Sequence, residues 1–484
     1  MLRRTFTNTA ATATRPFKLA VVGSGPAGFY TAHRLFREYD NTQVDMFDSL
    51  PIPHGLVRYG VAPDHPEVKN VMTTFDKVAE DKRFRFFGNV TIGSNTDPST
   101  ATVTVPELQN HYDAILFSYG ASEDRHLGIP NEDVYGSTSA RTFVGWYNGL
   151  PRDRDLQLPL QDTDTAVVIG QGNVALDVAR ILLSPIDDLR KTDITEYALE
   201  ALSKSRIKHV HVVGRRGPLQ AAFTAKELRE QLKLPGVQFH ADHTWIHDQI
   251  EANRSFLAKQ RPLKRLMGLL DQTPPHQDDI TSTKSWHLKF LRSPVEILAN
   301  NDKSAVTGIR YEINQLEGPV EKQRAVGTGR YETQECGLVL RSIGYKSLAM
   351  DGLPFDGKQG LVPNTFGKII DEQQNTLPGM YTAGWLKRGP TGVIVSTMSD
   401  AYETADTILN DLQQGVPMLS DITPRPSRNT DDDLLQLMHQ RQIRPVSYSD
   451  WKKIEAAEFE AGAKLGKPRE KFVCISDMLA VLGK

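Results

Sequence analysis

The sequence predicts an α/β protein with two Rossmann-like dinucleotide-binding domains. Short apolar runs alternate with helical patterns along the chain, which is typical of parallel sheets. Two of the strand-to-helix junctions carry a glycine-rich turn. The chain has 484 residues, of which 39% are hydrophobic, enough to fill sizeable cores.

Composition excludes several classes of protein. Lys and Arg total 57 against 59 Asp and Glu, a net charge of -2, so we expect no nucleic-acid partner. The two cysteines, Cys336 and Cys474, are too few for a disulfide scaffold, a cysteine-rich zinc site or an iron–sulfur cluster held by four thiolates. We expect no metal site. No stretch approaches the ~18 apolar residues of a membrane span, which predicts a soluble or at most peripheral protein.

Residues 1–17 are predicted to form a mitochondrial presequence. Arg3, Arg4 and Arg15 stand among Thr and Ala, and the first acidic residue is Glu38. A basic, hydroxyl-rich leader without acids is typical of mitochondrial targeting, and an apolar signal-peptide core is missing. The alternative is a plain tail before the first strand.

The first glycine turn comprises Gly23, Gly25, Ala27 and Gly28, between a predicted strand at 18–22 and a helix at 26–39. Small residues let the backbone approach a pyrophosphate, which the positive helix N-terminus then binds. Asp48 ends the next predicted strand, 43–47, where a carboxylate holds an adenosine ribose. The alternative is a purely structural turn.

The second turn, residues 170–175, lies between a strand at 165–169 and a helix at 173–183. Its following strand, 208–213, ends in Arg215 and Arg216 instead of an acid. Paired guanidinium groups suit a 2′-phosphate, so this site should prefer NADP to NAD. The polar insertion 184–206 lengthens the spacing, and two solvated arginines are the alternative.

One ribose carboxylate and one arginine pair indicate a flavoprotein that uses NADPH. A flavin accepts a hydride and can release its electrons one at a time. The chain has no Cys-x-x-Cys pair, so an internal redox disulfide is missing and the electron acceptor must be external. Further strands at 338–343 and 379–383 and helices at 393–409 and 451–459 complete the predicted elements.

Four blocks closely resemble the mitochondrial NADPH:adrenodoxin (ferredoxin) oxidoreductase family. They are residues 55–67 (GLVRYGVAPDHPE), 170–183 (GQGNVALDVARILL), 213–220 (VGRRGPLQ) and 384–394 (GWLKRGPTGVI). The resemblance runs from about residue 17 to 484 and includes the tail segments RPVS and GKPREK.

The resemblance implies an FAD domain that is discontinuous, with the NADP domain inserted in it. The expected boundaries are 18–120 for the first part of the FAD domain, 121–339 for the NADP domain and 340–484 for the second FAD part with its C-terminal tail. It implies electron transfer from NADPH through FAD, singly, to a mitochondrial [2Fe–2S] ferredoxin. Iron–sulfur assembly, haem or quinone modification and steroid pathways remain open as consumers.

Matching the family's motifs residue by residue gives the cofactor contacts. The FAD contacts implied, beside the first glycine turn, are Ala27, Asp48, Leu56, Val90, Trp385, Gly392, Val393 and Ile394. The NADP contacts implied are Gln171, Gly172, Asn173, Val174, Arg215, Arg216, Glu227 and Gly392. Asp48 stands where relatives have the longer Glu, and His54 where they have Phe.

Hydride transfer needs stacking and orientation more than acid–base help, so we name no obligatory catalytic residue. Trp385 is expected near the isoalloxazine ring, and a core tryptophan is the alternative. His65 and Asp177 are candidates for a hydrogen-bonded pair that tunes the flavin. Asp177 could equally cap or pair within its own helix.

A basic segment is the expected ferredoxin-docking site. Positive residues recur from Arg254 to Arg265, and Arg261 and Arg265 match the family's two docking arginines. Acidic ferredoxins would be steered to such a patch, although a solvated face is the simpler alternative. We expect a monomer in the mitochondrial matrix and leave peripheral contact with the inner membrane open. Two rival readings are a flavin oxidase or monooxygenase and a non-catalytic nucleotide-binding module.

Overall fold

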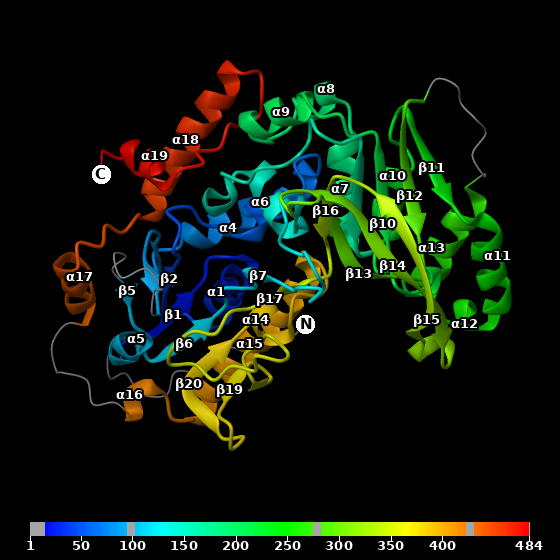
Figure 1. Ribbon diagram of the computed structural model, residues 1–484. Helices are drawn as coiled ribbons and strands as arrows, with labels where there is room; N and C mark the ends of the chain where they lie inside the picture. Colours follow the sequence, from blue (N-terminus) through cyan, green and yellow to red (C-terminus); the bar gives the residue numbers. More distant parts are fainter. Residues whose placement is uncertain (1–14, 94–101, 274–281, 423–429, 484) are drawn as a thin grey trace.

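Two mainly parallel sheets organise the chain, as Figure 1 shows for the computed structural model. The structure describes residues 15–93, 102–273, 282–422 and 430–483. Most of the expected presequence lies outside these residues. Of its last positions, Arg15 forms an ion pair with Asp113 at 2.6 Å, and Phe17 already begins the first strand.

The first sheet has seven strands. Five consecutive strands are parallel, and the two at one edge are antiparallel. Across the sheet the order is β18 (Asn364–Thr365), β19 (Lys368–Ile370), β20 (Thr376–Thr382), β6 (Ala114–Phe117), β1 (Phe17–Val22), β2 (Thr42–Phe47) and β3 (Phe84–Phe87).

Strand β1 shows why this sheet needs cover on both faces. Leu19 and Val21 point into a core beneath α1 (Pro26–Glu38) and α15 (Ile394–Gln414). Ala20 and Val22 point to the opposite core. A parallel strand that is buried on both faces therefore has a continuous run of apolar residues in its sequence. The opposite core is closed by α5 (Val105–His111), α16 (Leu419–Ile422) and α17 (Thr430–Gln440).

The second sheet has six parallel strands. Helices α6 (Ala140–Asn148) and α7 (Asn173–Leu183) cover one face. The order is β11 (Val237–Ala241), β12 (Lys284–Lys289), β10 (His209–Val213), β9 (Thr165–Ile169), β16 (Leu338–Arg341) and β8 (Ser137–Ser139). An antiparallel sheet of β13 (Arg292–Ala299), β14 (Val306–Glu317) and β15 (Arg324–Glu335) covers part of the other.

The chain leaves the first sheet after β6, builds the second and returns to the first at β18. The predicted arrangement of an inserted second domain is therefore confirmed. The expected boundary between residues 339 and 340 falls inside β16, which pairs with β9 in the second sheet. The two connections between the domains run together, because β7 (Glu123–Asp124) pairs with β17 (Tyr345–Lys346).

Three further groups of helices complete the described structure. The polar insertion after α7 forms α8 (Ile186–Leu189) and α9 (Glu196–Ser203). Helices α11 (His243–Ala252), α12 (Arg254–Ala258) and α13 (Arg261–Gln272) connect β11 to β12. The tail ends in α18 (Tyr448–Lys464) and α19 (Ile475–Ala480). Among the described residues, no helix combines the length and the hydropathy that crossing a bilayer requires.

Candidate functional site

The first glycine turn combines packed glycines with an open one. A Cβ on Gly23, whose φ is +103°, would lie 2.6 Å from the Tyr119 Cα, and one on Gly28 would lie 2.7 Å from the Gly23 carbonyl oxygen. A Cβ on Gly25 would meet no atom within 4 Å. Gly25 is also the N-cap of α1 and provides no side-chain cap. Open space beside uncapped N–H groups suits a bound pyrophosphate.

The second turn repeats this geometry. A Cβ on Gly170, at φ +124°, would overlap the Ser342 carbonyl oxygen, whereas one on Gly172 would meet nothing within 4 Å. Gly172 caps α7 without a side-chain hydrogen bond. The two turns therefore share one geometry, which suits a bound anion in each domain.

Later segments close around the first turn. A Cβ on Gly55, at φ +49°, would stand 3.2 Å from the Gly25 Cα, and one on Gly384, at φ +72°, would stand 2.7 Å from the Ala27 Cβ. Gly55 precedes Leu56 in α2 (Leu56–Tyr59), and Gly384 precedes Trp385 in α14 (Trp385–Arg388). These glycines bring both predicted FAD residues to the edge of the turn.

Asp48 lies at the end of β2, beside the same turn. It accepts hydrogen bonds from the Ser24 N–H at 3.0 Å and the Ser24 hydroxyl at 2.5 Å, and Leu50 N–H adds a third. Burial raises the pKa of Asp48, against the effect of these bonds. Val90 N–H donates to the Asp48 carbonyl at 2.9 Å, so the predicted Val90 contact lies in the same place.

His54, for which the resemblance implied a departure from Phe, is buried among aromatic rings. Its ring is 1% exposed and lies 5.5 Å from the Phe29 ring centroid. Burial holds the pKa of His54 well below its usual value. The imidazole is therefore neutral, and its Nε2 contacts the Tyr448 hydroxyl at 3.3 Å.

The loop at 389–394 carries the remaining FAD residues to the N-terminus of α15. Gly392 has φ +80°, and Val393 is the uncapped N-cap of the helix. Val393 is 54% exposed, an unusual state for a valine beside a buried core. Ile394 packs partly against the core beneath α1.

The second turn gathers most of the predicted NADP residues. The Asn173 side chain accepts from Thr224 N–H at 2.8 Å, which places the start of α10 (Ala225–Gln231), with Glu227, next to α7. Gln171 packs against Gly214, directly before the arginine pair.

Arg215 and Arg216 extend from a fixed backbone into solvent. Asn314 donates to the Arg215 carbonyl at 2.8 Å, and Leu291 N–H to that of Arg216 at 3.1 Å. Both side chains are exposed. A cavity of about 350 Å³ has Trp245, Phe290 and Leu291 in its wall, and it is this Leu291 that bonds to the Arg216 carbonyl. The arginine pair is thus anchored in position while its charges stay accessible.

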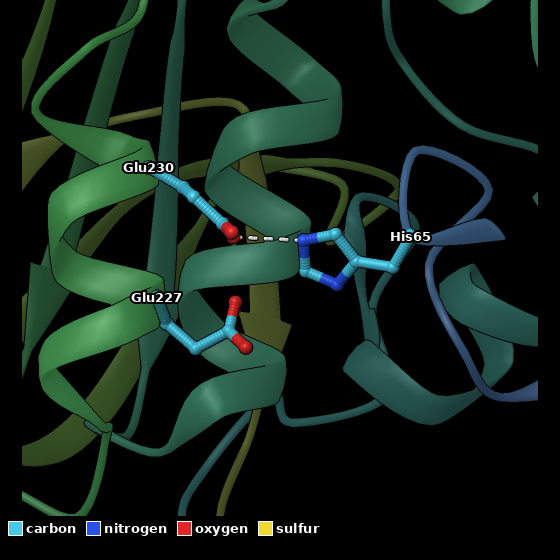
Figure 2. Close-up of side chains that lie close together, drawn as sticks. All are labelled: His65, Glu227 and Glu230. Carbon is cyan, nitrogen blue, oxygen red and sulfur yellow. Dashed lines mark hydrogen bonds and ion pairs between the residues drawn. The ribbon is translucent and has the colours of Figure 1, made fainter. Parts of the chain in front are cut away.

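His65 and Asp177 belong to one charged cluster at the domain boundary. His65 Nε2 bonds to Glu230 Oε2 at 2.8 Å, as Figure 2 shows. Asp177 instead accepts from Arg180 at 2.7 Å, and Arg180 also donates to Asp64 at 2.5 Å. The described contacts include no hydrogen bond between His65 and Asp177, so their role as a flavin-tuning pair stays a prediction.

The sequence did not predict three members of this cluster: Asp64, Arg180 and Glu230. Arg180 follows Asp177 by three positions and is 3% exposed, in a helix whose other buried residues are all apolar. A charged residue on the buried side of α7 was the available signal, because arginine is buried only with partners. Burial and the neighbouring Asp177 raise the pKa of Glu227 to about 7.

The basic segment is exposed at the start of α13. Arg254 pairs with Glu251 at 2.6 Å. Lys259, Arg261, Lys264 and Arg265 are exposed and form no ion pair with any described residue. The structure thus presents Arg261 and Arg265 as free positive charges.

Comparison with known proteins assigns the family. The profile of the pyridine nucleotide-disulphide oxidoreductases matches residues 17–259. NADPH:adrenodoxin oxidoreductase of Bos taurus is 48% identical over 478 residues, covering 96% of this chain and 92% of the bovine protein. The probable counterpart of Schizosaccharomyces pombe is 40% identical over 502 residues, covering 100% and 99%. This chain belongs to the NADPH:adrenodoxin oxidoreductase family.

A solved structure agrees with that assignment. Mycobacterium tuberculosis FprA in complex with NADPH has a TM-score of 0.85 and 39% identity, covering 96% of this chain and 99% of that chain. The predicted fold, FAD and NADPH as cofactors, oxidoreductase class and mitochondrial location are confirmed by family membership. The individual cofactor contacts stay predictions, and the open glycine positions fit them.

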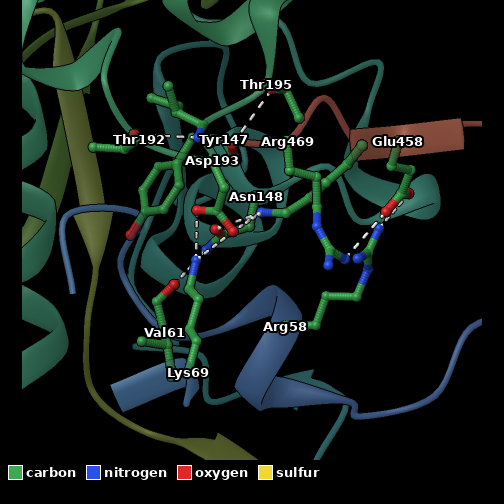
Figure 3. Close-up of polar contacts among 12 residues, drawn as sticks. Arg58, Val61, Lys69, Tyr147, Asn148, Thr192, Asp193, Thr195, Glu458 and Arg469 are labelled. Carbon is green, nitrogen blue, oxygen red and sulfur yellow. Dashed lines mark hydrogen bonds and ion pairs between the residues drawn. The ribbon is translucent and has the colours of Figure 1, made fainter. Parts of the chain in front are cut away.

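Buried ion pairs tie the two domains of this family member to its tail, as Figure 3 shows. Asp193 accepts from Lys69 at 2.6 Å and pairs with Lys471 at 3.0 Å. Glu458 pairs with Arg58 at 2.5 Å and with Arg469 at 3.2 Å.

These ion pairs join the first domain, the second domain and the tail, and most of their side chains are shielded from solvent. Lys471, Arg58 and Glu458 side chains are at most 1% exposed. Two lysines hold the pKa of Asp193 well below its usual range, and burial lowers the pKa of Lys471. Each carboxylate compensates two cations from different segments. Asp193 joins the second domain to the first domain and to the tail, whereas Glu458 joins the tail to the first domain.

We predict that Gly25→Ala and Gly172→Ala each impair one cofactor and spare the fold. A methyl group at either position fills only the open space, so the melting temperature of the apoprotein should change by less than about 3 °C. Gly25→Ala should lower FAD content after purification. Gly172→Ala should retain FAD and raise the KM for NADPH.

Gly170→Ala is the matched contrast, because its methyl group would overlap Ser342. It should lose stability, as measured by thermal unfolding. Equal unfolding of all three variants would contradict the division into open and packed glycines.

We predict that Asp193→Asn destabilises the protein by about 3–5 kcal/mol, because Lys69 and Lys471 lose their shared counter-charge in a buried site. Urea unfolding of the holoprotein measures the loss. Asp188→Asn is the control, since its pair with Lys191 is exposed and should contribute less than about 0.5 kcal/mol. Equal effects of the two changes would show that the buried pairs do not fix the domains.

Proposed function

We propose that this protein transfers electrons from NADPH, by way of FAD, singly to a [2Fe–2S] ferredoxin of the adrenodoxin type in the mitochondrial matrix. The observation that carries the proposal is the pair of open glycine turns, one beside a carboxylate and the other beside two exposed arginines. Bound FAD supplies the change from two-electron to one-electron chemistry.

The first domain binds FAD. The N–H groups at Gly25 and the start of α1 bind its pyrophosphate, and Asp48 accepts from the ribose hydroxyls in place of the Ser24 hydroxyl. Leu56 and Val90 line this site. Trp385 and the turn Gly392, Val393 and Ile394 surround the ring system, where the exposed apolar surface of Val393 becomes covered.

The second domain binds NADPH. The turn formed by Gln171, Gly172, Asn173 and Val174 holds the pyrophosphate at the start of α7, and Arg215 with Arg216 holds the 2′-phosphate. Glu227 and Gly392 bind the nicotinamide half. Support comes from Asn173, whose bond to Thr224 places Glu227 near the open turn.

The residues between the two turns orient the reactants. His65 and Asp177 lie in one cluster with Arg180. The bond from Arg180 to Asp64 joins the second domain to the first, whereas its bond to Asp177 lies within α7. Orientation of a hydride donor and acceptor in near contact contributes most of what such a transfer requires. His65 bonds to Glu230 through Nε2, and the Glu227 carboxylate accepts a hydrogen bond from Arg180 at 3.4 Å.

Ferredoxin docks on the basic segment. Arg261 and Arg265 are exposed and free of ion pairs with described residues, so they can attract an acidic protein. The monomeric state and peripheral contact with the inner membrane also stay predictions. Iron–sulfur assembly, haem or quinone modification and steroid pathways are all consistent consumers.

We predict that Arg215→Ala and Arg216→Ala reduce the preference for NADPH over NADH. Bonds to a charged group contribute about 1.5–3 kcal/mol each, so the KM for NADPH should rise roughly ten- to hundredfold. The KM for NADH should change less than about twofold, because it lacks the phosphate. A parallel rise for both nucleotides, measured by steady-state reduction of ferricyanide, would exclude phosphate binding by this pair.

We predict that NADPH-dependent reduction of cytochrome c requires ferredoxin and falls with salt. Reversal of both docking charges, Arg261→Glu with Arg265→Glu, should raise the KM for ferredoxin at least about tenfold, because steering to an acidic partner is lost. Ferricyanide reduction should stay unchanged.

Lys191→Glu with Lys204→Glu is the matched control, since it makes the same charge change on exposed lysines elsewhere. An equal loss in this control would assign the effect to net charge. Release of hydrogen peroxide, with no increase in cytochrome c reduction when ferredoxin is added, would instead support the hypothesis of a flavin oxidase.

A further inference from the structure

The cluster in Figure 2 joins metal-ligating groups from both domains. His65 precedes α3 (Pro66–Lys69) in the first domain, and Glu227 and Glu230 lie three positions apart on α10 in the second. One ligand atom from each lies within 4.8 Å of the others. His65 and Glu230 are 165 positions apart in the sequence, so no motif spacing predicts the site.

The donor set suits zinc. One imidazole nitrogen and two carboxylate oxygens, with a further position for water, are ligands that Zn²⁺ commonly takes in proteins. Side chains at i and i+3 lie on the same face of a helix, so Glu227 and Glu230 converge without distortion of α10. Figure 2 shows both carboxylates directed toward the imidazole.

The local charge favours a cation. Glu227 and Glu230 have three further carboxylates nearby, those of Asp64, Asp177 and Glu67, while the cations paired with the group are Arg180 and Lys226.

Neither cation neutralises the two glutamates fully. Arg180 bonds to Asp64 at 2.5 Å and makes a longer hydrogen bond to Glu227 at 3.4 Å, and Lys226 lies 3.8 Å from Glu230. His65 and Glu227 are 7% and 9% exposed, so solvent screens the excess negative charge weakly.

We propose that a Zn²⁺ ion binds His65 Nε2, Glu227 and Glu230 and bridges the two domains. The ion replaces the bond between His65 and Glu230 and takes neutral imidazole as a ligand. Because the proposed function gives Glu227 to the nicotinamide half of NADPH, the ion also competes with NADPH. This second statement rests on the proposed function, whereas metal binding does not.

Binding is tested by titrating the FAD-loaded protein with ZnCl₂ in a calorimeter, and with Co²⁺ followed by its visible absorption. We expect one site per chain, and an affinity at least tenfold lower in both Glu230→Gln and His65→Gln. Thermal unfolding checks that both variants fold. Absence of saturable binding in the unaltered protein overturns the proposal.

Glu67→Gln is the matched control, because it removes a nearby carboxylate that pairs with Lys226 and is not a ligand. Its zinc affinity should stay within about twofold of the unaltered protein. Equal weakening by Glu67→Gln and Glu230→Gln overturns coordination, since it would show attraction by general charge alone.

Competition is tested by NADPH-dependent ferricyanide reduction at fixed free Zn²⁺. We expect the ion to raise the KM for NADPH with kcat unchanged, and Glu230→Gln to remove this sensitivity. Zinc binding without a rise in KM overturns the competition. Zinc binding in a protein that fails to reduce ferredoxin leaves the site standing and contradicts the proposed function, so the two failures are distinguishable.

Discussion

Ion pairs to two carboxylates, Asp193 and Glu458, hold the two domains and the C-terminal tail together. Each binds two cations that come from different parts of the chain, among them Lys69 of the first domain and Lys471 of the tail. A buried charge without a partner costs several kcal/mol, so these segments must come together in one arrangement or not at all. The C-terminal tail is thereby part of the scaffold that orients both cofactor sites.

That orientation matters because transfer between two bound cofactors requires near contact. Each domain presents an open glycine at an uncapped helix N-terminus, Gly25 in the first and Gly172 in the second. Between them lies the cluster of His65 and Glu230, contributed by opposite domains. A change in domain orientation would alter all three at once, so the ion pairs of the tail act on function as well as stability.

The position of the cluster at the domain boundary explains why a bound metal ion would affect NADPH binding. A metal ion bound to both His65 and Glu227 would hold together two residues that come from different domains. The proposed function gives Glu227 to NADPH and His65 to the cluster that orients the reactants. Several carboxylates surround the buried Arg180 and compensate its positive charge, and the closest of them is Asp64. Charge placed to hold the domains therefore also creates a place for a cation.

The sequence by itself determined the two nucleotide turns, because their strands, glycines and helices are local. The predicted strand at 165–169 and helix at 173–183 agree with β9 and α7 to the residue. It did not reveal β12, which lies between β10 and β11 although its sequence, KSWHLK, is largely polar. Only the tertiary structure decided that His65 meets Glu230 and that Asp193 meets Lys471, since contacts between distant segments leave no periodicity in the chain.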